Sequence, residues 1–129
     1  MDSFDCVMPT RVARTGGALT WGGRVNMRNA VHAQDPAPLD AHCACPTCRR
    51  FSRGAIRHFL KAGEMLGAIL LTVHNLHFML RLMDDIRSAI GSGTFAQFRA
   101  AFHARHSITD QAVRHAQREK RAASGTYKI

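Results

Sequence analysis

The spacing of apolar residues predicts two helices in the second half of the chain. One begins behind Ser52, a residue type that caps helices, and runs to about Ala62. The other runs from about Asn75 to Ile90 and ends at Gly91, because glycine favours a helix end. The apolar residues at helical intervals are Ile56, Phe59 and Leu60 in the first helix, and Leu76, Met79, Met83, Ile86 and Ile90 in the second. Each helix must bury that stripe.

A short third helix is predicted after residue 94. Thr94 and Gln97 have the spacing of a capping box, in which side chains satisfy the first backbone N–H groups of a helix. The apolar stripe behind them consists of Phe95, Phe98 and Phe102. Beyond His106 charged residues and alanines replace the pattern, so no element is predicted there.

The first half of the chain has shorter apolar runs, interrupted by glycine and proline. Residues 4–9 predict a short strand that ends at a proline, because proline cannot donate to a strand ladder. Residues 18–20 and 24–27 predict the two strands of a hairpin, since Gly-Gly pairs punctuate this stretch. The sequence Asp-Pro-Ala-Pro at 35–38 ends regular structure before a cysteine-rich loop.

The length of 129 residues and the balance of 46% hydrophobic and 21% charged residues are typical of one small globular domain. The most apolar run, residues 65–73, is too short to cross a bilayer. Asp2 and Asp5 stand where an export signal would carry a basic region. We therefore expect a cytoplasmic chain without a membrane segment.

Basic residues outnumber acidic ones, with 18 Lys and Arg against 9 Asp and Glu and a formal charge of +9. A positive field concentrates polyanions near a protein, which makes nucleic acid the leading partner class. A solvated basic tail explains much of the same excess. The residues of that tail are Arg114, Arg118, Lys120, Arg121 and Lys128.

Cys43, Cys45 and Cys48 place three thiols within six positions. In a reducing compartment this density indicates a metal site rather than disulfides. Thiolates favour Zn²⁺, and a structural zinc site has four ligands, so one histidine should complete a Cys₃His set. Periodicity alone leaves four candidates, which are His42, His58, His74 and His77.

Several sequence blocks follow one another in a characteristic order. They are Phe4–Arg11 (FDCVMPTR), Asn26–Ala30 (NMRNA), Cys43–Cys48 (CACPTC) with Ser52-Arg53, Ala62–Gly67 (AGEMLG) and His74-Asn75. Their order and spacing resemble the C-terminal region of bacterial-type tRNA-guanine transglycosylases, from residue 1 to about residue 105.

The resemblance implies an α/β fold, a C-terminal fragment of a (β/α)₈ TIM barrel with a helical zinc-binding subdomain. Residues 1–40 would hold the last barrel strands with the nucleophile and the RNA-contact segment. Residues 41–106 would form the zinc-binding helical subdomain, and 107–129 a flexible basic tail. The family motif selects His74 as the fourth zinc ligand beside the three cysteines. In the family this zinc holds the subdomain on the barrel and activates no water.

The resemblance also implies an enzyme, a pentosyltransferase that exchanges guanine 34 of GUN anticodons in tRNA for a 7-deazaguanine during queuosine biosynthesis. The family's nucleophile matches Asp5, whose carboxylate would attack ribose C1′ and form a covalent intermediate. From the residues alone, a residue of a strand-end turn is the favoured interpretation of Asp5, and the resemblance reverses that preference. The family's anticodon-contacting segment matches Thr10, Arg11, Val12, Ala13 and Arg14, in which the two arginines would supply paired donors.

The sequence begins almost at the nucleophile motif, whereas the family's partner acid and base pocket lie upstream of it. We therefore expect a fragment that does not exchange guanine by itself, which incorporation of labelled guanine into tRNA would test. Family members are commonly homodimers through the zinc-containing region. The alternative function is a non-catalytic zinc module that binds RNA or a partner subunit.

Overall fold

The computed structural model describes residues 5–106 and residue 119. In chain order its elements are α1 (Met8–Arg14), β1 (Gly17–Thr20), β2 (Gly23–Asn26), the 3₁₀ turn η1 (Ala30–His32), α2 (Pro46–Arg50), α3 (Arg53–Ala62), α4 (Met65–Gly91) and α5 (Phe95–Arg105). The predicted basic tail lies outside the described residues, apart from Glu119.

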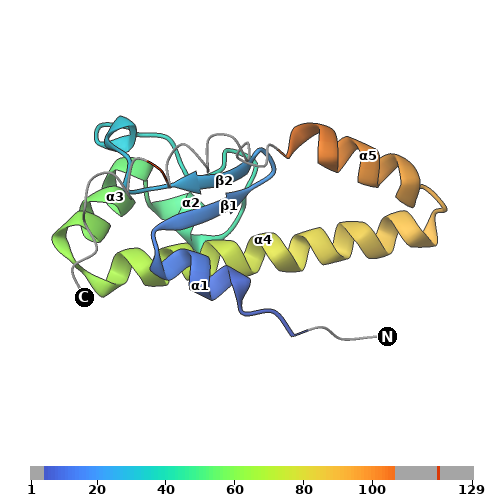
Figure 1. Ribbon diagram of the computed structural model, residues 1–129, viewed down its shortest axis with the longest axis horizontal. Helices are drawn as coiled ribbons and strands as arrows, with labels where there is room; N and C mark the ends of the chain where they lie inside the picture. Colours follow the sequence, from blue (N-terminus) through green and yellow to red (C-terminus); the bar gives the residue numbers. More distant parts are fainter. Residues whose placement is uncertain (1–4, 107–118, 120–129) are drawn as a thin grey trace.

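Helix α4 is the spine of the molecule (Figure 1). Helix α1, strand β1 and the short helices α2 and α3 all contact α4. Helix α5 folds back along the C-terminal half of α4 (Figure 1). A long helix can serve as a scaffold in this way because elements that are marginal alone gain stability by burying apolar faces against it.

The predicted hairpin is confirmed. Strands β1 and β2 pair antiparallel, with Gly17 opposite Asn26 and Thr20 opposite Gly23, and Trp21-Gly22 form the connection. Gly23 has a φ of 120°, a conformation that residues with a side chain rarely adopt. The glycine therefore permits the tight return that the sequence indicated.

The predicted strand at residues 4–9 is wrong over the described residues. Helix α1 begins at Met8, and residues 5–7 have no regular structure. Pro9 stands in the first turn of this helix, where its missing N–H has no intrahelical acceptor to lose. The proline that indicated a strand end is therefore part of a helix start.

Helix α3 has the bounds that its pattern predicted. The Ser52 Oγ accepts a hydrogen bond from the N–H of Ala55 at 3.2 Å, which makes Ser52 the N-cap. Gly63 ends the helix with a φ of 78°, in the left-handed region. Helix α3 lies close to α4, since a Cβ added to Gly67 would come within 2.9 Å of Leu60 Cγ.

Helix α4 begins ten residues earlier than its apolar spacing predicted, at Met65, and ends as expected at Gly91. The predicted stripe is not its buried face. Leu76 and Ile90 are exposed, and the other three stripe residues are only half-buried. The buried residues of the helix are Gly67, Leu70, Leu71, His74, Asn75, Phe78 and Ala89. The elements that contact α4 pack on the side opposite the predicted stripe. They bury the polar side chains of His74 and Asn75 together with the apolar residues.

One apolar core joins the first and second parts of the chain. It consists of Ala13, Ala18, Met27, Leu39, Ile56, Leu60, Leu70 and Leu71. The members come from α1, the hairpin, the connecting loop, α3 and α4. Residues before and after position 40 therefore share one packed interior in the described structure.

Asn75 joins three backbone segments inside this core, where it is fully buried. Its Oδ1 accepts a hydrogen bond from the N–H of Leu19 at 2.8 Å. Its Nδ2 donates to the carbonyl oxygens of Pro9 at 3.0 Å and Gly17 at 3.1 Å. One side chain thus satisfies the outer edge of β1 and a carbonyl of α1, groups that would be costly to bury unpaired.

Helix α5 docks through aromatic side chains. Trp21, at the hairpin turn, packs edge-on against Phe78 of α4 and Phe102 of α5, with ring centroids 5.3 and 6.0 Å away. The expected capping box is wrong, because the Thr94 side chain makes no cap hydrogen bond and instead lies 2.8 Å from the hydroxyl of Ser92. Packing on Trp21 holds the helix in its place.

The apolar run at residues 65–73 is by itself too short to cross a bilayer. The helix that contains this run, α4, is longer, and by length and composition it could cross a bilayer. The core helix of a folded protein passes the same test. Its contacts with α1, β1, α2 and α3, and its buried polar side chains, identify α4 as such a core helix.

Replacing Asn75 by alanine should destabilise the fold strongly. The change leaves the buried N–H of Leu19 and the carbonyl of Gly17 without the partner that the asparagine provides, and it removes a second donor from the Pro9 carbonyl. Together these losses cost roughly 3 kcal/mol. Urea unfolding of the 129-residue chain, followed by circular dichroism, measures this loss. The control is Leu76→Ala, on the neighbouring but exposed residue, and should cost less than about 1 kcal/mol. Equal losses in the two variants would refute the role of Asn75.

Candidate metal centre

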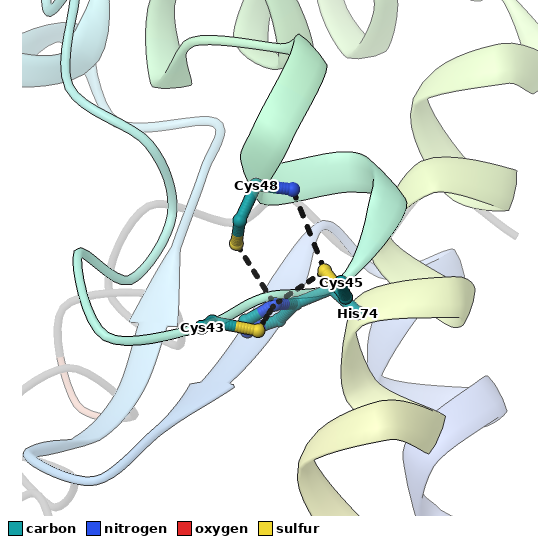
Figure 2. Close-up of side chains that lie close together, drawn as sticks. All are labelled: Cys43, Cys45, Cys48 and His74. Atoms are coloured by element: carbon teal, nitrogen blue, oxygen red, sulfur yellow. Dashed lines mark hydrogen bonds between the residues drawn. The ribbon is translucent and has the colours of Figure 1, made fainter.

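Four side chains converge between the cysteine loop and α4 (Figure 2). Cys43 lies in the loop before α2, Cys45 is the N-cap of α2, and Cys48 lies within that helix. His74 comes from the middle of α4. The three Sγ atoms and the histidine nitrogen all lie within 4.8 Å of one another. Residues separated by a long stretch of chain therefore form one compact donor set.

The distances within this set match those expected in the ligand shell of a metal ion. The Nδ1 atom of His74 lies 3.6 Å from Cys43 Sγ, 3.6 Å from Cys45 Sγ and 3.4 Å from Cys48 Sγ. A neutral imidazole nitrogen with one lone pair can accept one S–H donor, and three sulfurs at equal range exceed that capacity. For a tetrahedral zinc with bonds of roughly 2.3 Å to sulfur and 2.0 Å to nitrogen, a sulfur–nitrogen edge is about 3.5 Å. The four donors therefore fit a metal ion.

A backbone carbonyl fixes the orientation of the His74 ring. Nε2 lies 2.8 Å from the carbonyl oxygen of Leu19, so it carries the proton and donates to that oxygen. The side chain is fully buried, and this burial lowers the pKa of His74, which keeps the ring neutral. The Nδ1 lone pair then points toward the thiols. A hydrogen bond from the second nitrogen is the usual way to orient a histidine ligand.

Buried surroundings keep the thiols protonated unless a cation lies beside them. Burial raises the pKa of the Cys48 thiol to about 12 and also raises the pKa of Cys43. Neighbouring thiols add to this effect, because like charges disfavour one another. Three thiolates would therefore not coexist here at neutral pH without a positive charge between them. Metal binding supplies that charge and displaces the protons.

Short-range contacts hold the cysteine loop in shape. The N–H of Cys48 donates to Cys45 Sγ at 3.4 Å, across the first turn of α2. The buried hydroxyl of Thr47 donates to the carbonyl of Leu70 at 2.8 Å, which ties α2 to α4. An Asp40 oxygen accepts the N–H of His42 at 2.8 Å and shapes the turn that precedes Cys43. The donor geometry is thus built into the loop.

The structure brings to the thiols the histidine that the family motif selected and that periodicity alone had left open. His74 is in the group of four, whereas His42 and His58 are exposed and His77 is half-buried outside the group. Sequence reasoning missed the groups that hold the His74 ligand in place, which are the Leu19 carbonyl and the Asn75 side chain. The only sequence signal for it was the polar pair His74-Asn75 within an otherwise apolar helical stretch.

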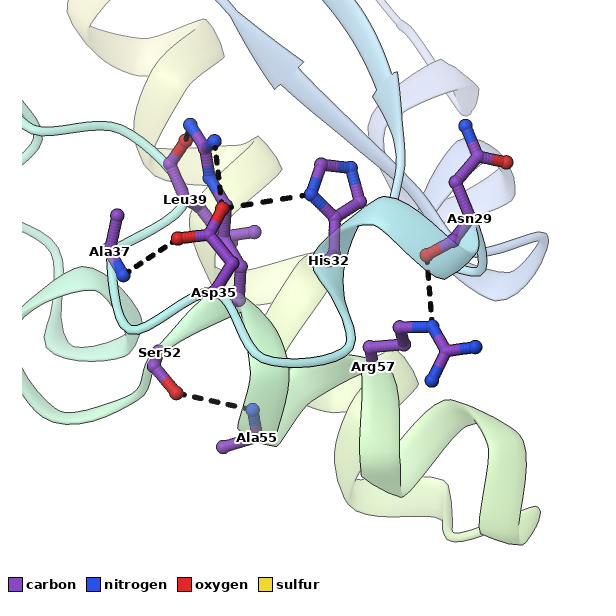
Figure 3. Close-up of polar contacts among 9 residues, drawn as sticks. Asn29, His32, Asp35, Ala37, Leu39, Ser52, Ala55 and Arg57 are labelled. Atoms are coloured by element: carbon purple, nitrogen blue, oxygen red, sulfur yellow. Dashed lines mark hydrogen bonds and ion pairs between the residues drawn. The ribbon is translucent and has the colours of Figure 1, made fainter.

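A second polar cluster braces the loop that leads to the cysteines (Figure 3). The Asp35 carboxylate accepts the N–H of Ala37 at 2.9 Å and pairs with Arg53 at 3.3 Å, and these contacts lower the pKa of Asp35. The ring of His32 lies 3.8 Å from the same carboxylate. Arg53 also donates to the carbonyl of Leu39 at 2.9 Å. The cluster thereby fastens residues 35–39 to the start of α3.

The structure does not bring Asp5 to the metal centre. Asp5 is exposed on the segment before α1, and its carboxylate makes no hydrogen bond or ion pair with any residue of 5–106 or 119. Of the segment expected to contact RNA, Arg11 and Arg14 are exposed, whereas Ala13 is fully buried in the core. Thr10 and Val12 are half-buried. The metal site and the Asp5 segment therefore lie at separate places on one core.

Comparison with known proteins identifies the family. A sequence model of the family described as queuine tRNA-ribosyltransferase matches residues 1–108. Proteins of that name are 57% identical over 102 residues in Novosphingobium aromaticivorans, 55% over 106 in Sphingopyxis alaskensis and 56% over 104 in Ralstonia nicotianae. These matches cover 79%, 82% and 81% of this chain but only 27%, 28% and 27% of the relatives. The chain therefore spans little more than a quarter of the relatives' length, and it belongs to the queuine tRNA-ribosyltransferase family, the tRNA-guanine transglycosylases that its motifs resemble.

Proposed function

We propose that this chain is the zinc-containing part of a tRNA-guanine transglycosylase, which exchanges guanine 34 of GUN anticodons for a 7-deazaguanine. The observation that carries the proposal is the family match over residues 1–108, together with a Cys₃His donor set in the same stretch. The relatives are named for ribosyltransfer to tRNA. The alternative of a non-catalytic zinc module is not favoured by these names.

Zinc is the metal that this donor set suits best. Three thiols and one imidazole are the ligands of structural Zn²⁺ sites, and four protein donors leave no position for a reacting water. Cys45 and His74 are fully buried, which also restricts access. The bound ion would therefore brace the protein by tying the loop at 43–48 to α4.

Asp5 is the proposed nucleophile. Its carboxylate oxygen would attack ribose C1′ of the target nucleotide while the bond from C1′ to guanine breaks and guanine leaves with the electron pair. The incoming base would then attack the same carbon and release the Asp5 carboxylate. This double displacement splits one difficult substitution into two steps. The exposure of Asp5 supports the proposal, because a polynucleotide can reach it.

Helix α1 would position the anticodon loop beside Asp5. Arg11 and Arg14 are exposed on this helix and make no ion pair with any described residue, so both guanidinium groups are available for phosphate or base edges. The half-buried Thr10 and Val12 could contribute smaller contacts. The buried Ala13 would act by packing α1 on the core.

The rest of the enzyme would cover one apolar face of α4. Exposed large residues follow one another at spacings of three and four along this helix, and they are Leu66, Ile69, Val73, Leu76 and Leu80. Such a stripe is typical of a helix that packs on a neighbouring layer. We propose that the neighbour is the (β/α)₈ barrel, with residues 1–40 as its last segment and 41–106 as the zinc-binding subdomain. The barrel would also provide the partner acid and the base pocket.

The proposed reaction also defines the setting of the protein. Its macromolecular substrate is tRNA, and reduced cysteines in the metal site suit the cytoplasm. Family members commonly form homodimers through the zinc-containing region, and we propose the same for the complete enzyme.

Reduced, purified chain should contain one zinc ion per molecule. Alanine at Cys43, Cys45, Cys48 or His74 should abolish high-affinity binding and lower helical content, because the metal contributes folding free energy. Elemental analysis and circular dichroism measure the two effects. Zinc affinity should fall as pH is lowered, since the raised thiol pKa values mean that protons compete with the ion.

Two residues outside the donor set provide matched controls for this experiment. Cys6→Ala and His58→Ala, both at exposed positions, should keep full zinc content. Retention of zinc by the His74→Ala variant, or a metal content near zero in the reduced parent, would contradict the assignment.

The role of Asp5 requires a complete enzyme, obtained by joining this chain to the upstream part of the Novosphingobium relative. Asp5→Asn should lower guanine exchange by more than ~10³-fold, roughly 4 kcal/mol of barrier, because an amide is a poor nucleophile. The covalent tRNA adduct should also disappear from denaturing gels. Asp84→Asn, an exposed aspartate on α4, is the control and should exchange guanine normally. Turnover within a few-fold of the parent would exclude Asp5 as nucleophile.

A further inference from the structure

A stretch of the chain next to Asp5 carries positive charge without compensation. Residues 6–34 contain four arginines and no aspartate or glutamate. This stretch folds into α1, the hairpin and η1, so its charges are gathered on one small unit. Two of the arginines, Arg11 and Arg14, are already assigned above to RNA. The positions of the other two, Arg24 and Arg28, are set by the fold.

Arg28 has a structural role. Its Nη1 donates to the carbonyl of Leu60 at 3.1 Å, which links the end of the hairpin to the end of α3. Its side chain lies across Gly16, where an added Cβ would come within 3.0 Å of Arg28 Cγ. This arginine ties the hairpin to α3, and its guanidinium has a protein partner.

Arg24 is held in place by one hydrogen bond, and its other guanidinium donors have no partner among residues 5–106. Its Nη2 donates to the Thr15 hydroxyl at 3.2 Å, and a Cβ on Gly17 would lie only 2.7 Å from Arg24 Nε. The absence of a side chain at Gly17 therefore lets the guanidinium lie across the backbone beside Val12. The residue is exposed and makes no ion pair with a described acid.

Helix geometry puts Arg24 in line with the arginines of α1. Pro9 and Ala13 are buried and mark the inner face of that helix. At about 100° per residue, Arg11 lies on the opposite, outer face, with Arg14 on one side of it and position 15 on the other. The Arg24 guanidinium donates to the Thr15 hydroxyl, so it lies next to the outer face of α1 on which Arg11 and Arg14 stand.

We propose that Arg24 is a further phosphate-binding residue, which forms with Arg11 and Arg14 a cationic track for the tRNA strand that runs past Asp5. This inference rests on the proposed function and deepens it. An arginine that is ordered before binding loses little conformational freedom when it meets a phosphate, and its planar fork suits phosphate oxygens. Thr15 and Gly17 act as positioning residues for the Arg24 guanidinium.

The salt dependence of RNA binding tests the proposal. A fluorescein-labelled anticodon stem-loop with a GUN anticodon is titrated with the zinc-loaded 129-residue chain over a range of salt concentrations. Removing one phosphate contact lowers the slope of log Kd against log salt by about one. Arg24→Ala and Arg24→Gln should both show this loss and a several-fold higher Kd at low salt. The glutamine variant keeps a donor and much of the stem, so it tests charge separately from packing.

Arg87→Ala is the matched control, because that exposed arginine already pairs with Asp84 on α4 and should leave the slope unchanged. Zinc content and circular dichroism equal to those of the parent show that each variant is folded. Suppose that the parent chain binds the RNA with a measurable salt slope. If Arg24→Gln has the same slope as the parent, or if Arg87→Ala lowers the slope as much as the Arg24 variants do, then Arg24 is not a phosphate-binding residue, and the proposed function stands. If the parent shows no salt-dependent binding, RNA recognition by this part fails, and the Arg24 inference fails with it.

Discussion

The fold depends on one peptide segment, the backbone of Leu19, being bonded by two consecutive side chains of α4. The Leu19 carbonyl accepts from His74 Nε2, and the Leu19 N–H donates to Asn75 Oδ1, both at 2.8 Å. Strand β1 pairs with β2 on its other edge, so α4 completes its hydrogen bonding where a third strand would otherwise lie. The same contact aims His74 Nδ1 at the thiols. Hairpin and metal centre consequently fix each other's geometry.

Through this coupling, a metal ion bound at the four donors would constrain the position of more distant parts of the molecule. From Leu19 the constraint continues through Asn75 to the carbonyls of Pro9 and Gly17, and thus to α1. Helix α1 follows directly on the Asp5 segment. Hydrogen bonds inside the core therefore connect the candidate metal centre to α1, which directly follows the proposed nucleophile Asp5. A brace of this kind acts by holding position, which agrees with a donor set that leaves no site for water.

The exposed faces of this core differ in chemistry. One side of α4 carries a stripe of solvent-exposed apolar side chains, and such a surface is typical of a contact with another protein layer. The outer face of α1 carries arginines in a stretch without acids, which suits a polyanion. The relatives are nearly four times as long as their match to this chain, so the proposed complete enzyme would have further protein to cover the apolar stripe. The cationic face would stay free for the proposed RNA substrate.

The sequence by itself determined the features that depend on a few neighbouring residues. Those features include the hairpin with its glycines, the Ser52 cap, the clustered thiols and the family motifs. Tertiary structure decided the rest. It made residues 8–14 a helix, chose the buried side of α4, and replaced the Thr94 cap by aromatic docking on Trp21. It also brought His74, which the family motif had selected, within reach of the thiols. The physical reason is that a turn or cap is stabilised within its own few residues, whereas the buried side of a helix depends on which distant elements pack against it.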